Sequence, residues 1–334
     1  MRVVTSPDPD VWSRYVSEHP HGNIFQTPEI AEVFRLTKNY KPITLAVVDN
    51  GDILALLQAV VISELGGKLG TLTSRSIVYG GPIVVNDKSG IEALKLLMSS
   101  YDRKILGNAI YTELRNMWDT SNISNVMNNI GYIYKEHLNF LLNLSKSRED
   151  LWNNLTKKRR NNIRRAKKKG VKVKEINDID SIPIFYNILY DTYKNAKLPL
   201  ADISLFYSVF NILYPRDMAK FFVAEYEDRY IGGILVLIYR GYVYWWYGGM
   251  LREFSRFCPT DLLLWHAIEW SSKKGYRIFD FGGAGSPNKE YGVRKFKEQF
   301  GGKKVNFGRY RKIHSPLKWR FVSLLFRFYR RLKW

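Results

Sequence analysis

The sequence predicts an α/β protein made of two tandem domains, each a mixed β-sheet flanked by helices. Its 334 residues suffice for two domains with separate hydrophobic cores. Short β-prone runs alternate with amphipathic helical runs along the whole chain. The order of these runs repeats, since a Tyr-Gly-Gly triplet at 79–81 and another at 247–249 each follow a strand–turn–strand–strand unit and precede a helix. We therefore expect an internal duplication of one α/β unit.

The first half begins with helical sequence over 11–40, interrupted by His19-Pro20-His21-Gly22. The dipeptide Asn50-Gly51 then separates two β-prone runs and predicts a tight hairpin. The remaining expected elements are strands at 43–48, 53–62, 109–115 and 135–144, one strand ending at Tyr79, and helices at 91–101 and 124–130. This order places the first domain at residues 1–146.

The second half repeats the order after a helix expected at 148–169. Further helices are expected at 179–196, 202–214, 260–274 and 289–300, and strands at 220–226, 230–239, 242–246, 277–281 and 304–311. The second domain is thus expected at 147–314, followed by a C-terminal segment at 315–334.

The net charge of +21 is concentrated in two segments. Residues 157–169 hold nine cations and no carboxylate, and residues 303–334 hold eleven cations and no carboxylate. This distribution indicates an anionic partner at particular places. The cations that we expect to contact an RNA backbone are Lys157, Lys158, Arg159, Arg160, Arg164, Arg165, Lys167 and Lys168. The alternative is a basic face that packs against an acidic part of its own domain.

Composition excludes several other classes of protein. A single cysteine precludes an internal disulfide, and five scattered histidines without His-x-x-x-His spacing argue against a metal site. The N-terminus lacks the layout of a signal peptide, and no run reaches the ~18 uncharged apolar residues of a membrane-spanning helix. We expect a cytoplasmic protein.

The C-terminal segment 315–334 predicts a basic amphipathic helix. Its apolar stripe is Leu317, Phe321, Leu324, Leu325, Phe328 and Leu332, and tryptophans lie near both ends. This pattern is typical of a helix that lies in a membrane interface, where it would meet a lipid-linked substrate. A helix that packs on the second domain has the same pattern.

The stretch 278–302 is the strongest candidate for a functional site. A β-prone run ending in Asp280-Phe281 is followed by Gly282, Gly283 and Gly285, and then by a short helix that carries Arg294 and Lys297. Such a turn would direct backbone N–H groups and two cations at one spot, which suits a phosphate or an acyl-transfer oxyanion. The alternative is a tight turn followed by lysines that only solvate a helix.

The order of elements is that of the GNAT acyltransferase fold, and the chain resembles the FemX/FemAB family of non-ribosomal aminoacyltransferases over nearly its whole length. The matching stretches are His21-Gly22-Asn23-Ile24-Phe25-Gln26, LWNNLTKKRRNNIRRAKKKGVKV at 151–173, and Asp280-Phe281-Gly282-Gly283 followed by Tyr291-Gly292-Val293 and Phe296-Lys297. The long coiled-coil arm of some members is absent.

The resemblance implies transfer of an amino acid from aminoacyl-tRNA to an amino group of a peptidoglycan-like precursor, with no cofactor beyond this co-substrate. Lys297, preceded by Phe296, matches the lysine proposed to stabilise the oxyanion. Asp280 is a candidate to hold the amine or act as base, although capping the turn is its expected role. The expected substrate-binding residues are Arg294, Tyr247, Gly248, Gly249, Gly282, Gly283, Tyr291 and Glu113.

The chain departs from the family on the acceptor side. Some members have Arg-x-Asp-Pro where this chain has Glu113-Leu114-Arg115-Asn116, so the aspartate is missing and Glu113 is the candidate substitute. Two other functions remain open at this point. One is an acyl-CoA-dependent N-acyltransferase, and the other is a non-catalytic protein that binds nucleic acid or a membrane surface.

Overall fold

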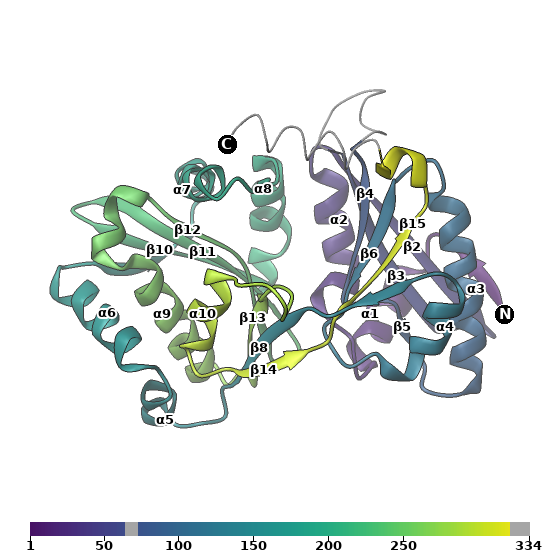
Figure 1. The fold of residues 1–334 in the computed structure, drawn as a ribbon, viewed down its shortest axis with the longest axis horizontal. Coiled ribbons are helices and arrows are strands. Elements are labelled where there is room, and N and C mark those ends of the chain that lie inside the picture. The colour runs from purple at the N-terminus through teal and green to yellow at the C-terminus, as the bar shows by residue number, and fades with distance from the viewer. Residues whose placement is uncertain (64–72, 321–334) are drawn as a thin grey trace. The chain divides into compact units, whose positions relative to one another are not determined.

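The computed structural model describes residues 1–63 and 73–320, and the chain forms two compact units (Figure 1). The first unit comprises Met1–Glu136 and the chain from Phe307 onward, and the second unit is His137–Asn306. None of the helices in the described ranges has the length and hydropathy needed to cross a membrane.

The first unit is a mixed sheet with flanking helices. Its strands are β1 (Arg2–Val4), β2 (Tyr40–Asp49), β3 (Asp52–Ile62), β4 (Arg75–Tyr79), β5 (Ile83–Val84), β6 (Tyr111–Arg115), β7 (Ile133–Lys135) and β15 (Arg309–Ile313). Seven of them follow the order β1-β2-β3-β4-β6-β15-β7, in which β4 and β6 are parallel, and β5 pairs with β3 outside this order. Its helices are α1 (Pro9–Glu18), α2 (Pro28–Leu36), α3 (Lys88–Ile105) and α4 (Ser124–Asn129).

The second unit has the same design. Its strands are β8 (Leu138–Asn143), β9 (Lys172–Glu175), β10 (Ala219–Tyr226), β11 (Arg229–Tyr239), β12 (Tyr242–Met250), β13 (Ile278–Gly283) and β14 (Lys303–Asn306). They follow the order β9-β10-β11-β12-β13-β8-β14, in which β12 and β13 are parallel. Its helices are α5 (Arg148–Asn153), α6 (Lys157–Lys168), α7 (Ile182–Asn195), α8 (Ile203–Ile212), α9 (Pro259–Lys273) and α10 (Gly292–Glu298).

The two strand orders match position by position, which confirms the tandem fold. In both sheets a three-stranded antiparallel meander is followed by a parallel neighbour: β2-β3-β4 and β6 in the first, β10-β11-β12 and β13 in the second. The expected hairpin is also present, because Asn50 and Gly51 both have positive φ between β2 and β3, as a type I′ turn requires.

The domain boundaries differ from the expected ranges because the units exchange strands. β8 follows β7 directly but pairs with β13, and β15 follows β14 but pairs with β6. Residues 137–146 therefore belong to the second unit, and residues 307–314 belong to the first. The chain crosses at Glu136-His137 without a glycine or proline, so the sequence reads as one continuous strand over 135–144.

Two expected helices also differ. The helix expected at 148–169 is two helices, because the Thr156 hydroxyl accepts the Arg159 N–H and begins α6 as a new helix. Of the amphipathic segment 315–334, residues 321–334 lie outside the described residues. Its first part packs on the first unit, where the Trp319 ring lies 5.1 Å from the ring of Tyr111, while Leu317 is exposed.

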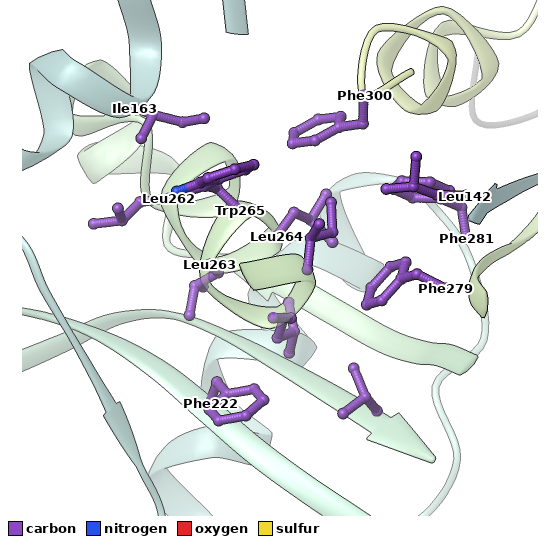
Figure 2. Packing of buried hydrophobic residues seen from close by; sticks show 14 of the residues in the cluster. Leu142, Ile163, Phe222, Leu262, Leu263, Leu264, Trp265, Phe279, Phe281 and Phe300 are labelled. Atoms are coloured by element: carbon purple, nitrogen blue, oxygen red, sulfur yellow. The ribbon is translucent and has the colours of Figure 1, made fainter. Parts of the chain in front are cut away.

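The core of the second unit lies between α9 and one face of the sheet (Figure 2). Phe279 and Phe281, two positions apart on β13, both point to this face. The ring centroid of Phe300, just after α10, lies 6.0 Å from that of Phe281. Trp265 of α9 is completely buried in the same cluster. Because strand residues alternate between faces, Asp280 points to the opposite side of the sheet from these phenylalanines.

Candidate functional site

The parallel strands β12 and β13 part at the site. Their last paired residues are Tyr244 and Asp280, after which β12 continues to Met250 without β13, while β13 stays paired with β8 on its other side. A register shift leaves Trp246 as the extra residue of a β-bulge in β12. The equivalent strands of the first unit, β4 and β6, stay paired to their last residues, Tyr79 and Arg115. Bulges next to a strand opening are common at active sites, so the second unit is the candidate catalytic unit.

The glycine turn at the end of β13 is fixed by a buried carboxylate. Asp280 is 2% exposed, and its Oδ1 accepts hydrogen bonds from the Gly282 N–H at 2.7 Å and from Asn139 Nδ2 at 2.8 Å. Gly282 has φ of +70°, a conformation that glycine adopts without strain. Asp280 therefore caps the turn, as a carboxylate at this position was expected to do.

Lys297 of α10 lies against this turn. Its Nζ donates to the carbonyl oxygens of Gly282 at 3.2 Å and Gly283 at 3.0 Å, and it lies 5.0 Å from the centroid of the Trp245 ring. The side chain is buried, yet no carboxylate among residues 1–63 and 73–320 forms an ion pair with it. An ammonium has three N–H donors, and acceptors in the described chain occupy two of them.

Burial shifts the pKa values of Lys297 and Asp280, the two titratable groups at the glycine turn. It lowers the pKa of Lys297 to about 8, and the nearby Asp280 charge opposes this shift. Burial also raises the pKa of Asp280 to about 6, opposed by the hydrogen bonds from Gly282 and Asn139 and by the Lys297 charge. Near pH 7 the site therefore holds an ammonium and a carboxylate, both close to their titration points.

The other expected residues of α10 and its preceding loop have contacts within the chain. Arg294 donates to the carbonyl oxygens of Ser286 and Pro287 and also to that of Lys289, so its guanidinium holds this loop. Phe296 packs on the core beside Phe300. Tyr291 is half-exposed and contacts the turn at Gly285, where an added Cβ would lie 3.0 Å from its ring.

The triplet 247–249 lies inside β12 and is not a loop. Trp245 Nε1 donates to the Tyr247 carbonyl oxygen at 2.9 Å, and a Cβ on Gly248 would lie 2.6 Å from that nitrogen. A Cβ on Gly249 would lie 2.6 Å from the hydroxyl of Thr192 on α7. The two glycines thus make room for the indole of Trp245 and for α7, and Trp245 in turn faces Lys297.

Glu113 lies in the first unit, where its buried carboxylate is surrounded by arginine side chains. It is 4% exposed and forms ion pairs with Arg115, Arg309 and Arg311. Burial alone would raise the pKa of Glu113, but the three guanidinium groups outweigh burial and lower it to about 2. A carboxylate held this firmly is a poor base, so these contacts argue against a role for Glu113 as a substitute for the missing aspartate.

The basic helix α6 has an inner and an outer side. Arg159 is buried in an ion pair with Asp261 at 2.7 Å, and Arg160 donates to the Asn153 and Leu155 carbonyl oxygens. These two arginines therefore hold the helix in place, and of the two only Arg159 has the acidic partner that the alternative of an internal contact supposed. The exposed cations of the helix are Lys157, Lys158, Arg164, Arg165, Lys167 and Lys168.

Sequence reasoning missed Asn139 and Trp245. Asn139 comes from β8, and only the exchange of strands between units places it beside Asp280. Trp245 precedes the Tyr-Gly-Gly triplet, and the glycine at position 248 was a usable signal, since it leaves space for a large neighbouring side chain.

Comparisons with known proteins agree with this architecture. Residues 157–297 match the acetyltransferase (GNAT) domain family. The chain is 21% identical over 324 residues to the UDP-N-acetylmuramoylpentapeptide-lysine N(6)-alanyltransferase of Weissella viridescens, covering 90% of this chain and 92% of that protein. It is 20% identical to the lipid II:glycine glycyltransferase of Staphylococcus epidermidis, with 86% of each covered. The crystal structure of FemX superposes with a TM-score of 0.72 at 17% identity, covering 96% of this chain and 100% of that one.

The chain is a FemX/FemAB-like transferase with the GNAT fold. A tandem GNAT protein from the clavulanic acid pathway has the same fold at a TM-score of 0.58 and 9% identity, covering 94% and 99% of the two chains. In this FemX-like transferase the matched family range covers α6, the parting strands β12 and β13, and Lys297 itself. It therefore falls on the unit that carries the site described above.

Proposed function

We propose that the protein transfers an amino acid from aminoacyl-tRNA to an amino group of a peptidoglycan precursor, in the cytoplasm where charged tRNA is made. The observation that carries the proposal is the environment of Lys297, a buried ammonium beside the opening between β12 and β13. Two of its donors are held by Gly282 and Gly283, and the third has no acceptor within the described residues. The names of the relatives from Weissella and Staphylococcus support the substrate class.

The reaction requires a hydrogen-bond donor beside the carbonyl oxygen of the aminoacyl ester. The acceptor amine attacks the carbonyl carbon of the aminoacyl ester, and the carbonyl oxygen gains a negative charge. When the tetrahedral intermediate collapses, an amide bond forms, the ester bond breaks, and the 3′-oxygen of the tRNA leaves with a proton originating from the amine. An ammonium fixed beside the negatively charged carbonyl oxygen stabilises the transition state by about 3 kcal/mol. We assign this role to Lys297.

Asp280 has a supporting role in this scheme. Its Oδ1 accepts from Asn139 and from the Gly282 N–H, so the carboxylate holds the turn whose carbonyl oxygens bind Lys297. Phe296 packs on the core and fixes the helix. Arg294 fixes the loop before α10 through its three carbonyl contacts. Tyr291 and the turn at Gly282 and Gly283 remain the proposed contacts of the substrate.

The outer side of α6 is the proposed contact for the tRNA backbone. Six cations are exposed there, and neither α6 nor its C-cap Lys169 contains a carboxylate. Lysine and arginine neutralise phosphates and release counterions, so affinity should fall steeply with salt. The proposed contact leaves out Arg159, which is buried in its ion pair, and Arg160, whose guanidinium donates to two backbone carbonyl oxygens.

The test supplies purified protein with a radiolabelled mixture of aminoacyl-tRNAs and, as acceptors, UDP-N-acetylmuramoyl-pentapeptide or lipid II. We expect label to appear in the acceptor and to disappear after RNase pretreatment of the donor. Transfer that needs an acyl-CoA donor and is insensitive to RNase would contradict the proposal and would favour a CoA-dependent N-acyltransferase.

A pair of charge-reversal variants tests the RNA contact. Changing Arg164, Lys167 and Lys168 to glutamate should raise KM for the tRNA at least 10-fold, because three phosphate contacts become repulsive. The matched control changes three exposed lysines of the first unit, Lys41, Lys88 and Lys95, and alters the net charge equally. Equal effects of the two variants on KM would show that only overall charge matters and would refute a specific contact.

A further inference from the structure

The helix that carries the catalytic lysine is short. α10 has seven residues, its N-cap residue Tyr291 makes no side-chain capping bond, and most of its surface is exposed. An isolated helix of this length is unstable in water, so α10 depends on contacts from the rest of the unit. The position of Lys297 is therefore determined by whatever holds α10.

Arg159 of α6 contacts α10 close to Lys297. Its Nε donates to Gln299 Oε1 at 2.8 Å, and its guanidinium carbon lies 4.6 Å from the centroid of the Phe296 ring. Phe296 directly precedes Lys297, and Gln299 is the C-cap residue of α10. One guanidinium therefore contacts α10 on both sides of the lysine along the chain.

Arg159 is itself fixed. Its Nη1 donates to Asp261 Oδ1 of α9 at 2.7 Å, and Asn162 of α6 donates to the same carboxylate oxygen at 3.1 Å. Both side chains of the ion pair are 8% exposed. A backbone bond adds to the link, since the N–H of Thr156, the N-cap of α6, donates to the Gln299 carbonyl oxygen at 3.1 Å.

Helix α6 connects the proposed RNA surface to α10 through Arg159. α6 presents its exposed cations outward and Arg159 inward, so one helix contacts both the proposed RNA surface and α10. The guanidinium is planar and donates to two partners at fixed angles, which a lysine at this position would not reproduce. A shift of about 1 Å at a reacting group is enough to cost ~10²-fold in rate.

We propose that Arg159 is a positioning residue that holds Phe296 and Gln299, and through them Lys297, in register with the basic helix α6. The inference rests on the proposed function for its kinetic consequences. One consequence can be measured without turnover, namely that the burial of the Lys297 side chain against the glycine turn depends on Arg159.

The principal variant is the double change Arg159→Met/Asp261→Leu. It removes the guanidinium without leaving the Asp261 carboxylate buried and unpaired, and apolar replacement of a buried ion pair is often neutral for stability. A milder variant, Gln299→Met, removes only the hydrogen bond from Arg159 and leaves the ion pair intact. The inert control is Arg229→Met, which removes an arginine from an exposed pair with Glu253 in the same unit.

The first measurement is competitive labelling of Lys297 with acetic anhydride over a range of pH, read by mass spectrometry on the full chain. In the wild type the labelling midpoint should lie near the pKa of Lys297, about 8. In the double variant we expect the midpoint to move up toward the ordinary lysine value and the labelling to become faster, because the side chain is less buried. An unchanged midpoint and rate in both variants would overturn the proposal.

The second measurement separates kcat from KM in aminoacyl transfer. The double variant should lower kcat by about 10- to 100-fold while KM for the tRNA changes little. Arg164→Met, on the outer side of α6, should do the reverse and raise KM. A loss confined to KM in the double variant would place Arg159 in RNA binding and refute the positioning role. If the wild type shows no transfer, the proposed function fails, but the labelling result still decides the role of Arg159.

Discussion

The ammonium of Lys297 lies 5.0 Å from the centroid of the Trp245 ring, so this buried cation faces a π-system and two carbonyl oxygens in place of a carboxylate. An ion pair would fix the charge and occupy its donors. The aromatic ring and the carbonyl dipoles hold the ammonium more weakly, and burial lowers its pKa. This arrangement keeps a donor available for charge that develops during a reaction.

Turnover should fall as the pH rises through about 8. Lys297 is cationic below its lowered pKa and neutral above it, and only the cation stabilises an oxyanion strongly. The measurement is kcat from pH 6 to 10 at saturating donor. Lys297→Arg keeps a cation throughout this range, so its kcat should be lower but should show no alkaline fall. A wild-type rate that is flat to pH 10 would rule out the ammonium as the active form.

Lys297→Met should stabilise the fold at pH 7 by about 1–3 kcal/mol while abolishing transfer. The folded-state pKa is lowered, so the folded protein binds this proton more weakly than the unfolded chain does. The wild type should therefore gain stability as the pH rises from about 8 toward the ordinary lysine value of 10.5, and the variant should lack this gain. Urea unfolding at pH 7 and pH 9.5 measures both effects, and equal stabilities of the two proteins at pH 7 would contradict the argument.

Gly282→Ala should reduce turnover more than stability. Its φ of +70° is unfavourable for alanine by about 1 kcal/mol, and the added Cβ would lie 3.2 Å from the Trp245 carbonyl oxygen. To relieve this contact, the turn must shift the carbonyl oxygen that binds Lys297. Gly275→Ala is the matched control, since Gly275 has φ of +77° and nothing within 4 Å of its added Cβ.

The two glycine variants are compared by thermal unfolding and by kcat. Both should lose similar stability because they share the backbone strain, and only Gly282→Ala should lose kcat by about 10-fold or more. Equal loss of kcat in both would mean that the turn has no special relation to the reaction.

The parts of the fold that could be predicted from sequence are those set by local patterns. Hydrophobic periodicity, the Asn50-Gly51 turn and the repeated element order are local, and they led to the tandem fold. The strand exchange was missed because pairing partners are a long-range property, and nothing near Glu136 distinguishes β8 from a continuation of β7. Boundaries drawn along the sequence were consequently displaced.

The same distinction applies to the site. Lys297 and the glycine turn lie within twenty residues of each other, so the sequence could place them together, and the structure brings them into hydrogen-bond contact. Arg159 was assigned to RNA because the segment 157–169 holds nine cations and no carboxylate, but its helical position faces Asp261, which is 102 residues away. Charge alone cannot tell which side of a basic helix is buried, whereas the apolar residues Ile163 and Ala166 mark the buried side of α6.

Glu113 should make the first unit sensitive to acid. Its folded-state pKa of about 2 lies below the ordinary glutamate value of 4.5, so its contribution to stability is complete above pH 4.5 and is lost as the pH falls toward 2. A pKa shift of this size corresponds to about 3 kcal/mol of stability. Its cause is the contact with three arginines, two of which belong to the exchanged strand β15.

Glu113→Gln should therefore lower the free energy of unfolding at pH 6 and flatten its dependence on pH between 5 and 3. Glu253→Gln, in an exposed pair with Arg229, should leave both unchanged. Parallel pH profiles for the wild type and Glu113→Gln would show that the arginine cluster does not hold β15 in the sheet.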